Sequence, residues 1–558
     1  MRKMIIKNWR RVFVIILSSS LYAIASITSA SYYGYIVEHA HNKEITLFFM
    51  MIAAGITVVL LRWVFDVLNQ TLMVRFVGKI IYEIREKMIA SIISKQVSDF
   101  KTKELSSYTS SLLNDVELIE RDSIEPFFDF ISQLVIVAIS SAAILYLQPV
   151  VFVVIMIGSV IVFAIPTLMS KKLQNKQSRF SAESEALTES ATDILNGFST
   201  VKSTQSTDQF LEGFKETNKH YTGAKISSGQ WIMSNYATSA MLGMLVQYAA
   251  VLAAIWFIMQ GVISVGIMLT MVQTMNTLVY PLIDIFRLIP QMKSAKPIIE
   301  KIKNLSVLGQ SDQNSIPKLT FKKDICLTKV SLKLQGTSIL NDISLTLDKN
   351  NKYLLIGDSG SGKSTLANIV SGFINNYTGK ITVDGNEIAN NESMFSIVSH
   401  VDQSPYLFNK TVEENIVLGK KMNHKKFEEV LKISAADLFL ANKSRLKNKS
   451  THNGDNYSGG ERQRIAIARG LYQQKPLLVL DESLSGLNAK LAHRIEKDIL
   501  ALKDLTLLYI THKFDMSLLC SYDKIIWIKE NKIYQMASPE VLLSDQEFQQ
   551  FIDATGKA

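Results

Sequence analysis

Six long apolar segments in the first half of the chain constrain its fold more than any other feature. A helix needs about 20 mostly apolar residues to cross the hydrocarbon core of a membrane, because each residue rises about 1.5 Å. Segments of this length cover residues 12–37, 45–68, 127–147, 150–169, 233–259 and 262–286. The first is longer than a signal-peptide core and ends without a small-residue cleavage site, so we expect a retained helix. The sequence predicts an all-α transmembrane domain of six helices over residues 1–305.

The charges around these segments predict their orientation. Five bases precede the first segment, and cytoplasmic loops are enriched in such residues: Arg2, Lys3, Lys7, Arg10 and Arg11. The long second-to-third and fourth-to-fifth connections are rich in Lys and Arg, whereas the short third-to-fourth and fifth-to-sixth connections have none. We expect both termini in the cytoplasm, and a bacterial plasma membrane because no organelle-targeting extension precedes the first helix. The formal net charge of +10 is explained by membrane flanks, so the lipid bilayer is an expected partner and nucleic acid is not.

The long basic connections are expected to be helical. In the first of them, apolar residues recur at helical spacing between Ile80 and Ile93. The membrane helices should therefore continue into the cytoplasm and end in short turns that can contact another domain. Within the second segment, Arg62 and Asp66 are four residues apart and are expected to pair on one helix face, with a substrate contact as the alternative.

A polar linker over residues 306–318 leads to a second region, residues 319–558, in which strands and helices alternate. This alternation predicts an α/β domain with a mainly parallel sheet. Cys326 and Cys520 both lie in it, and two distant cysteines predict neither a disulfide framework nor a metal site.

The strongest motif of the second region is Gly-Asp-Ser-Gly-Ser-Gly-Lys-Ser at residues 357–364. It lies between an apolar strand and a helix, which is the setting of a phosphate-binding loop. Glycines allow backbone N–H groups to approach phosphates, and the helix N-terminus adds positive potential. Lys363 is predicted to bind the β- and γ-phosphates of ATP, and Ser364 to coordinate Mg²⁺. The other predicted ATP-binding residues of this loop are Gly357, Ser359, Gly360, Gly362 and Thr365.

A second motif is an apolar strand that ends in two acids, residues 477–482. Such a strand can deliver Asp481 to the shell of the metal and leave Glu482 beside the γ-phosphate, where it can polarise a water molecule. Following a phosphate-binding loop, this motif predicts ATP hydrolysis.

Between the two motifs the chain resembles the ABC transporter family. Ser458, Gly459 and Gly460 begin the sequence Ser-Gly-Gly-Glu-Arg-Gln-Arg, which is similar to the family signature. The resemblance implies that the signature of one subunit completes the ATP site of another, so two chains must pair. A helix that starts with small residues offers accessible N–H groups to an anion, which suits this role.

Two further residues match the family one by one. Gln403 resembles the glutamine that touches Mg²⁺ and relays to the membrane domain, and His512 resembles the histidine that holds the γ-phosphate and positions the catalytic carboxylate. The resemblance therefore implies Glu482 and His512 as catalytic residues. It implies Ser364, Gln403 and Asp481 as metal ligands.

The chain departs from the family pattern at four positions. Leu334 occupies the place of an aromatic residue that stacks on adenine. Tyr457 replaces the usual Leu of the signature, and Glu461 its usual Gln. Asn488 stands where an Asp normally contacts the opposite site, a contact that the resemblance links to communication between the two sites.

Together these features predict a dimeric, ATP-driven exporter, with a homodimer favoured and a heterodimer left open. The signature and the compact six-helix core resemble bacterial peptide and bacteriocin exporters, which implies a peptide cargo. Only six residues precede Lys7, so we do not expect this chain to cleave a leader peptide. A lipid flippase or multidrug exporter is the alternative. An ATP-gated, non-hydrolysing channel or receptor is disfavoured because Glu482 and His512 are both present.

Overall fold

The computed structural model describes residues 9–39, 45–101, 105–307, 318–334, 336–440, 446–513 and 515–555. The chain forms two compact units, one from Met1–Ser91 with Leu105–Val307, the other from Ile92–Glu104 with Leu308–Ala558. The turn after the second long helix is thus grouped with the second unit. The domain limits at residues 305 and 319 stay predictions, because residues 308–317 of the linker lie outside the described ranges.

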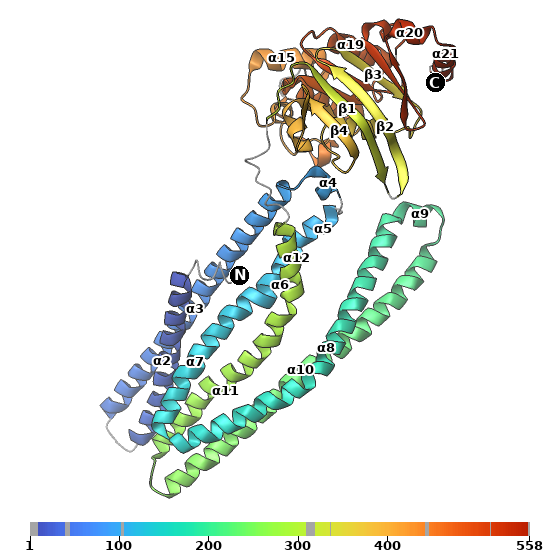
Figure 1. The fold of residues 1–558 in the computed structure, drawn as a ribbon. Coiled ribbons are helices and arrows are strands. Elements are labelled where there is room, and N and C mark those ends of the chain that lie inside the picture. Colours follow the sequence, from blue (N-terminus) through green and yellow to red (C-terminus); the bar gives the residue numbers. More distant parts are fainter. Residues whose placement is uncertain are drawn as a thin grey trace. The chain divides into compact units, whose positions relative to one another are not determined.

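The described part of the first unit is helical (Figure 1). Its helices, with two π-helical segments η1 and η2, are α2 (Trp9–His39), α3 (Ile45–Ile93), α5 (Leu105–Ser110), η1 (Ser111–Asp115), α6 (Val116–Ile119), η2 (Glu120–Ile124), α7 (Glu125–Leu147), α8 (Pro149–Asn196), α9 (Phe198–Ser203), α10 (Thr207–Met259), α11 (Val265–Ser294) and α12 (Lys296–Val307). Helices α3, α8 and α10 contain 49, 48 and 53 residues. About 20 residues are enough to cross a bilayer, so these helices are longer than a membrane span requires. The predicted extension of the membrane helices is therefore confirmed.

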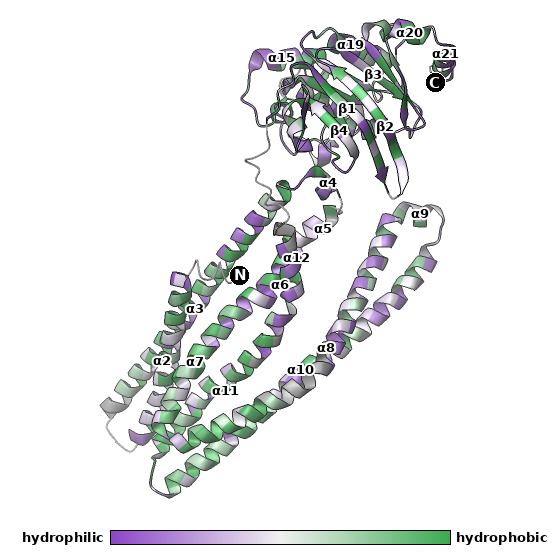
Figure 2. Cartoon of the chain, viewed as in Figure 1, coloured by the Kyte–Doolittle hydropathy of each residue, from purple (hydrophilic) through white to green (hydrophobic). Residues whose placement is uncertain are grey.

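Five helical stretches of the described residues are long and apolar enough to cross a membrane: Trp9–His39, Phe49–Ile93, Ser107–Leu147, Thr207–Met259 and Val265–Lys303. The apolar start of α8 qualifies only as a shorter stretch, Pro149–Val162. Each of the six predicted segments therefore lies in a helix, apart from residues 262–264 before α11, and five of these helices reach full length. Figure 2 shows the polar residues of α8 and α10 concentrated toward α9 and the apolar ones toward the opposite ends.

Side-chain hydrogen bonds tie three membrane helices together. Ser18 Oγ on α2 donates to Asn69 Oδ1 on α3 at 2.7 Å. Ser19 Oγ lies 3.2 Å from the same oxygen and 2.9 Å from Ser132 Oγ on α7. Such bonds contribute about 1 kcal/mol each within a membrane, so packing carries most of the stability.

The expected ion pair between Arg62 and Asp66 is wrong. Among the described residues no ion pair joins them, and the guanidinium carbon of Arg62 lies 5.8 Å from the ring centre of Tyr22 on α2. The neighbouring helix offers an aromatic face, which the spacing within α3 alone does not reveal.

The second unit contains two sheets. The strands are β1 (Asp324–Leu334), β2 (Thr337–Asp348), β3 (Lys352–Gly357), β4 (Thr378–Val383), β5 (Asn386–Glu387), β6 (Val398–Val401), β7 (Leu477–Asp481), β8 (Thr506–Ile510), β9 (Lys524–Lys529) and β10 (Lys532–Ala537). The order of the larger sheet is β10-β9-β3-β8-β7-β6, parallel except for β10, so the mainly parallel sheet is confirmed. The smaller sheet, β2-β1-β4-β5, is antiparallel and was not predicted.

Short helices cover these sheets. They are α4 (Val97–Phe100), α13 (Lys363–Val370), η4 (Asn391–Ser396), α14 (Val412–Val417), α15 (His424–Ile433), α16 (Asp437–Leu440), η5 (His452–Gly454), α18 (Gly459–Tyr472), α19 (Ala489–Leu500), η6 (Leu519–Ser521), α20 (Pro539–Leu543) and α21 (Gln546–Thr555). Every residue of β3, β7 and β8 is buried, as expected for parallel strands covered on both faces.

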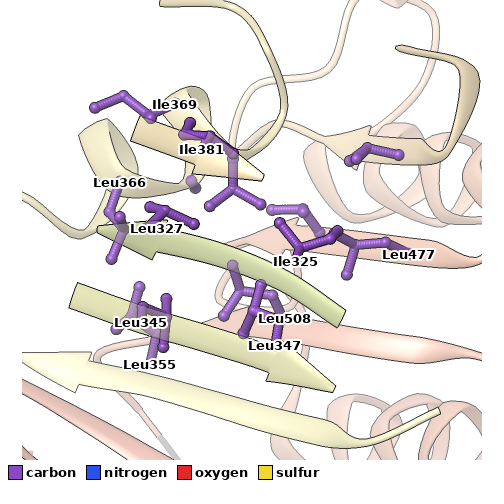
Figure 3. Close-up of a cluster of buried hydrophobic side chains, with 14 of the residues drawn as sticks. Ile325, Leu327, Leu345, Leu347, Leu355, Leu366, Ile369, Ile381, Leu477 and Leu508 are labelled. Carbon is purple, nitrogen blue, oxygen red and sulfur yellow. The ribbon is translucent and has the colours of Figure 1, made fainter. Parts of the chain in front are cut away.

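The core between the sheets fixes their stacking (Figure 3). Ile325 and Leu327 of β1 lie in one buried cluster with Leu355 of β3 and with Leu477 and Leu508 of β7 and β8. The parallel register pairs Asp481 with Ile510 and Leu355 with Ile510. The carboxyl ends of these strands therefore meet at one edge of the sheet, where ligands bind in open α/β folds.

Candidate active site

The glycine-rich loop between β3 and α13 takes a path that side chains would block. Gly357 has φ +152°, and a Cβ there would lie 2.2 Å from the carbonyl oxygen of Ile528. Gly362 has φ +95°, and a Cβ there would lie 2.6 Å from Leu340 Cδ2. Both positions need glycine, so the loop can wrap the start of α13 with its backbone amides.

Lys363 is 4% exposed and folds back over this loop. Its Nζ donates to the carbonyl oxygens of Gly357 at 2.9 Å and of Asp358 at 2.7 Å. Burial lowers the pKa of Lys363, and the Glu482 carboxylate opposes this shift. In the described part of the chain the lysine forms no ion pair and donates only to these carbonyl oxygens, so its charge is free for an anion.

The rest of the loop is open to a ligand. Ser359 and Gly360 are exposed, and Thr365 is half-buried. Ser361 Oγ is buried and has no hydrogen-bond partner among the described residues, which is unusual for a buried hydroxyl. A cradle of amides, one buried ammonium and an unused hydroxyl donor fits the phosphates of ATP.

Asp481 ends β7 with its side chain 7% exposed. Ser364 Oγ donates to its Oδ1 at 3.0 Å, and burial raises the pKa of the carboxyl. No base lies within ion-pair distance of Asp481 among the described residues. A buried carboxylate beside a hydroxyl, with no positive partner, fits a hard divalent cation such as Mg²⁺.

Glu482 is held at both carboxylate oxygens. Gln403 Nε2 donates to its Oε2 at 2.8 Å, and His512 Nε2 lies 2.9 Å from its Oε1. The backbone of Glu482 has φ +47°, a region that non-glycine residues seldom adopt, and its N–H donates to the carbonyl of Ile510 at 2.9 Å. The structure thus stores strain at this position in order to aim the carboxylate.

The signature residues form the start of α18. Ser458 Oγ accepts from the N–H of Glu461 at 3.3 Å, and Glu461 Oε2 accepts from the N–H of Ser458 at 2.9 Å. This capping box explains why Glu is accepted where the family has Gln. No hydrogen bond or ion pair of the described residues links the three signature residues, Ser458, Gly459 and Gly460, to Lys363 or Glu482. The other predicted site residues lie around the glycine-rich loop and Glu482. The three signature residues are not connected to that group.

The remaining departures have local explanations. Asn488 caps α19, because its Oδ1 accepts from the N–H of Leu491 at 2.9 Å. Tyr457 is buried, with its ring 6.5 Å from that of Phe439. Leu334 ends β1 and is 46% exposed, so an apolar side chain is available where the family stacks an aromatic one.

Helix α4 packs within the second unit through residues that the sequence did not single out. The N–H of Val97 donates to Glu392 Oε1 at 3.2 Å, and Lys101 Nζ lies 5.9 Å from the ring centre of Phe373. The Phe373 ring meets that of His400 edge-to-face at 5.1 Å.

His400 links Phe373 to the segment that contains Gln403. Its Nδ1 lies 2.8 Å from Ser371 Oγ and its Nε2 3.2 Å from Asp402 Oδ1. The histidine lowers the pKa of Asp402, which directly precedes Gln403. Contacts therefore run from α4 through Phe373 and His400 to the glutamine that holds Glu482. No motif marks His400 or Phe373, because their role depends on contacts between distant parts of the chain.

A second unpredicted pair flanks His512. His493 Nδ1 on α19 lies 2.6 Å from Asp515 Oδ2, three residues after His512. The pair ties the segment that contains His512 to the helix capped by Asn488.

Two family models match the chain. One, described as ABC transporter, covers residues 340–485, and the other, described as ABC transporter transmembrane region, covers residues 12–282. The chain belongs to the ABC transporter family. This ABC transporter is accordingly an ATP-hydrolysing exporter with several membrane-spanning helices.

Proteins that are similar to this ABC transporter have names that state different cargoes. The ABC transporter is 26% identical to an ATP-dependent lipid A-core flippase of Sodalis glossinidius, over 90% of this chain and 88% of that protein. It is 25% identical to a sublancin-168-processing and transport ATP-binding protein of Bacillus subtilis, over 97% of this chain and 77% of that protein.

A solved structure has the same fold. A bacterial Atm1-family ABC exporter with ATP bound aligns with a TM-score of 0.82, at 18% identity, over 98% of each chain. This likeness confirms the predicted architecture of a helical transmembrane domain followed by an ATPase domain.

Proposed function

We propose that this ABC transporter works as a dimer that exports a peptide across a bacterial plasma membrane, with ATP hydrolysed at Glu482. The observation that carries this proposal is the carboxylate of Glu482, held by Gln403 at 2.8 Å and by His512 at 2.9 Å. A carboxylate fixed at both oxygens beside a phosphate-binding loop can orient a water molecule and accept its proton.

The other residues of the site support this role. Lys363 neutralises phosphate charge, and the amides of the loop donate to phosphate oxygens. His512 would keep Glu482 in position through the 2.9 Å contact of its Nε2 and would donate to the γ-phosphate of a bound ATP. Ser364 and Asp481, with Gln403, would hold Mg²⁺, which supplies positive charge at the β- and γ-phosphates when bound.

The signature residues support a dimer. Ser458, Gly459 and Gly460 begin a helix whose first amides suit an anion, yet the described contacts leave them unconnected to the loop of their own chain. A second copy would bring its signature to this loop and complete the site. Both termini would lie in the cytoplasm, as the charges of the loops predict.

A peptide cargo is supported by relatives whose names include sublancin and lactococcin processing and transport. A lipid cargo is the second candidate, because the flippase relative matches over 90% of the chain. Export of either cargo requires the same ATPase chemistry, so the ATP site does not distinguish the two candidates.

The test is ATP turnover by the purified chain in lipid nanodiscs, beside Glu482→Gln and the exposed control Glu540→Gln. We expect turnover in the parent and the control, and a loss of at least about 100-fold in Glu482→Gln, because general-base catalysis supplies that much. ATP binding should persist in the variant, since Lys363 and the loop are intact. Stimulation of turnover by peptides or by lipids then separates the two cargo candidates.

An inactive parent chain would contradict the self-sufficient homodimer and indicate a missing second subunit. Full turnover in Glu482→Gln would contradict the role of Glu482.

A further inference from the structure

A cavity of about 290 Å³ lies between the first turns of α2 and the part of α3 that follows its apolar segment. Three cations line it: Arg11 from α2, and Arg75 and Lys79 from α3. The rest of its wall is apolar, and includes Ile15, Leu72 and Phe76.

The three cations have no acidic counterpart there. No aspartate or glutamate lines the cavity, and in the described ranges none of the three bases forms an ion pair. Arg75 and Lys79 are four residues apart on one helix, a spacing at which like charges destabilise each other. The guanidinium carbon of Arg11 lies 5.8 Å from the ring centre of Phe76 in the same wall. An anion in the cavity would relieve this repulsion.

The apolar part of the wall continues onto the outside of the helices. Ile15 and Phe76 are buried at 2% and 4% exposure and belong to the core of the first unit. On α2, Val14 lines the cavity and is 42% exposed, and Leu17, three residues further along the same helix, is 49% exposed. A ligand whose charged end enters the cavity can therefore lay an apolar tail against α2.

The cavity lies where both helices leave the apolar region. Arg11 precedes Ser18 by seven residues and Arg75 follows Asn69 by six, and the Ser18–Asn69 hydrogen bond joins the two helices at that level. At 1.5 Å per residue, both cations lie about 10 Å from this bond, on the same side. Trp9, 62% exposed, adds an aromatic residue of the kind enriched at membrane interfaces.

We propose that this cavity binds the phosphate headgroup of an anionic phospholipid, from the leaflet nearest the N-terminus of α2. A volume of about 290 Å³ has room for a phosphate headgroup, and the acyl chains stay outside against α2. Basic pockets between membrane helices bind anionic headgroups in this way. The site is separate from the ATP-binding loop, and it does not depend on the identity of the cargo.

The test is native mass spectrometry of the full-length, detergent-purified chain with phosphatidylglycerol and phosphatidylcholine as probes. The variant is Arg11→Gln, Arg75→Gln and Lys79→Gln combined. Its control combines Lys87→Gln, Lys215→Gln and Lys219→Gln, which removes the same charge from exposed positions of α3 and α10. The parent and the control should retain phosphatidylglycerol over phosphatidylcholine. In the variant, the preference for phosphatidylglycerol over phosphatidylcholine should be at least about tenfold weaker, since each basic residue contributes about fivefold to the affinity.

Arg75→Gln alone, compared with Lys87→Gln, covers the case in which the triple variant does not fold. Arg75 is exposed, so this change should leave the fold intact and weaken phosphatidylglycerol retention by about fivefold. An unchanged lipid preference in the folded variants would overturn the proposal, as would an equal loss in the controls. Displacement of phosphatidylglycerol by millimolar inorganic phosphate would also overturn it, because the cavity would then be a site for free phosphate.

Discussion

At the scale of single residues, the second unit contains a buried acid that the proposed chemistry does not use. Glu496 on α19 is 6% exposed, and Tyr522 Oη donates to its Oε1 at 2.6 Å. Burial raises the pKa of Glu496 from 4.5 to about 6. Because the folded pKa is the higher one, its stabilising contribution is complete below pH 4.5 and is lost as the pH rises through 6.

This shift predicts the effect of Glu496→Gln. The amide keeps an oxygen for Tyr522 and carries no charge, so it avoids the cost of burying the ionised acid. At pH 7.5 we expect the free energy of unfolding of the second unit to rise by about 2 kcal/mol, but by only about 0.4 kcal/mol at pH 4.5. Calorimetric melting at both pH values checks this, with exposed Glu540→Gln as the control. An equal effect at the two pH values would contradict the raised pKa.

At the scale of elements, α4 is a helix of four residues that is too short to be stable alone. Its last amides form helical bonds, from Phe100 N–H to the carbonyl of Gln96 at 3.0 Å and from Lys101 N–H to that of Val97 at 3.1 Å. These bonds depend on the contacts of α4 with Phe373 and Glu392 in the same unit.

We therefore predict that Phe373→Ala loosens α4. Amide hydrogen exchange at residues 100 and 101 should become about two- to fivefold faster, because the lost cation–π contact with Lys101 corresponds to about 0.5–1 kcal/mol of local stability. Hydrogen exchange measured by mass spectrometry checks this in the full-length chain. Phe210→Ala on α10, which removes the same ring from a partly exposed position, should leave these amides unchanged. Unchanged exchange in Phe373→Ala would mean that other contacts hold α4.

At the scale of the whole molecule, two compact units should unfold separately. In the first, α2 and α11 cross closely: a Cβ on Gly34 would lie 2.1 Å from Thr270 Oγ1 and 2.2 Å from the carbonyl oxygen of Gly266. Gly34→Ala should therefore force the helices apart and lower the melting temperature of the first unit by several degrees, because overpacking costs about 1–3 kcal/mol.

Gly213→Ala on α10 is the matched control, since a Cβ there meets nothing within 4 Å. It should leave the first unit unchanged or slightly more stable, because alanine favours helices. Calorimetry of the full-length chain should show the transition of the second unit unmoved in both variants. A shift of both transitions in Gly34→Ala would contradict separate unfolding.

The sequence predicted those parts of the molecule that depend on local patterns. The apolar segments, the loop of Lys363 and the strand that ends at Asp481 each lie within a short stretch of chain. The contact of Gln403 with Glu482 joins residues 79 positions apart. The resemblance to a family pointed to Gln403 as a metal ligand, but not to this contact. Neither the local patterns nor the family resemblance indicated Phe373, His400 or the His493–Asp515 pair, because side chains from separate elements meet only in the folded unit.

The separation of Ser458 from the Lys363 loop has a genetic consequence. If each ATP site takes its loop from one subunit and its signature from the other, two different inactive alleles can complement each other. A subunit with Lys363→Ala still offers an intact signature, and one with Ser458→Arg still offers an intact loop. Their mixed dimer would contain one complete site and one doubly damaged site, so a cell with both alleles would regain part of the activity that each allele alone abolishes.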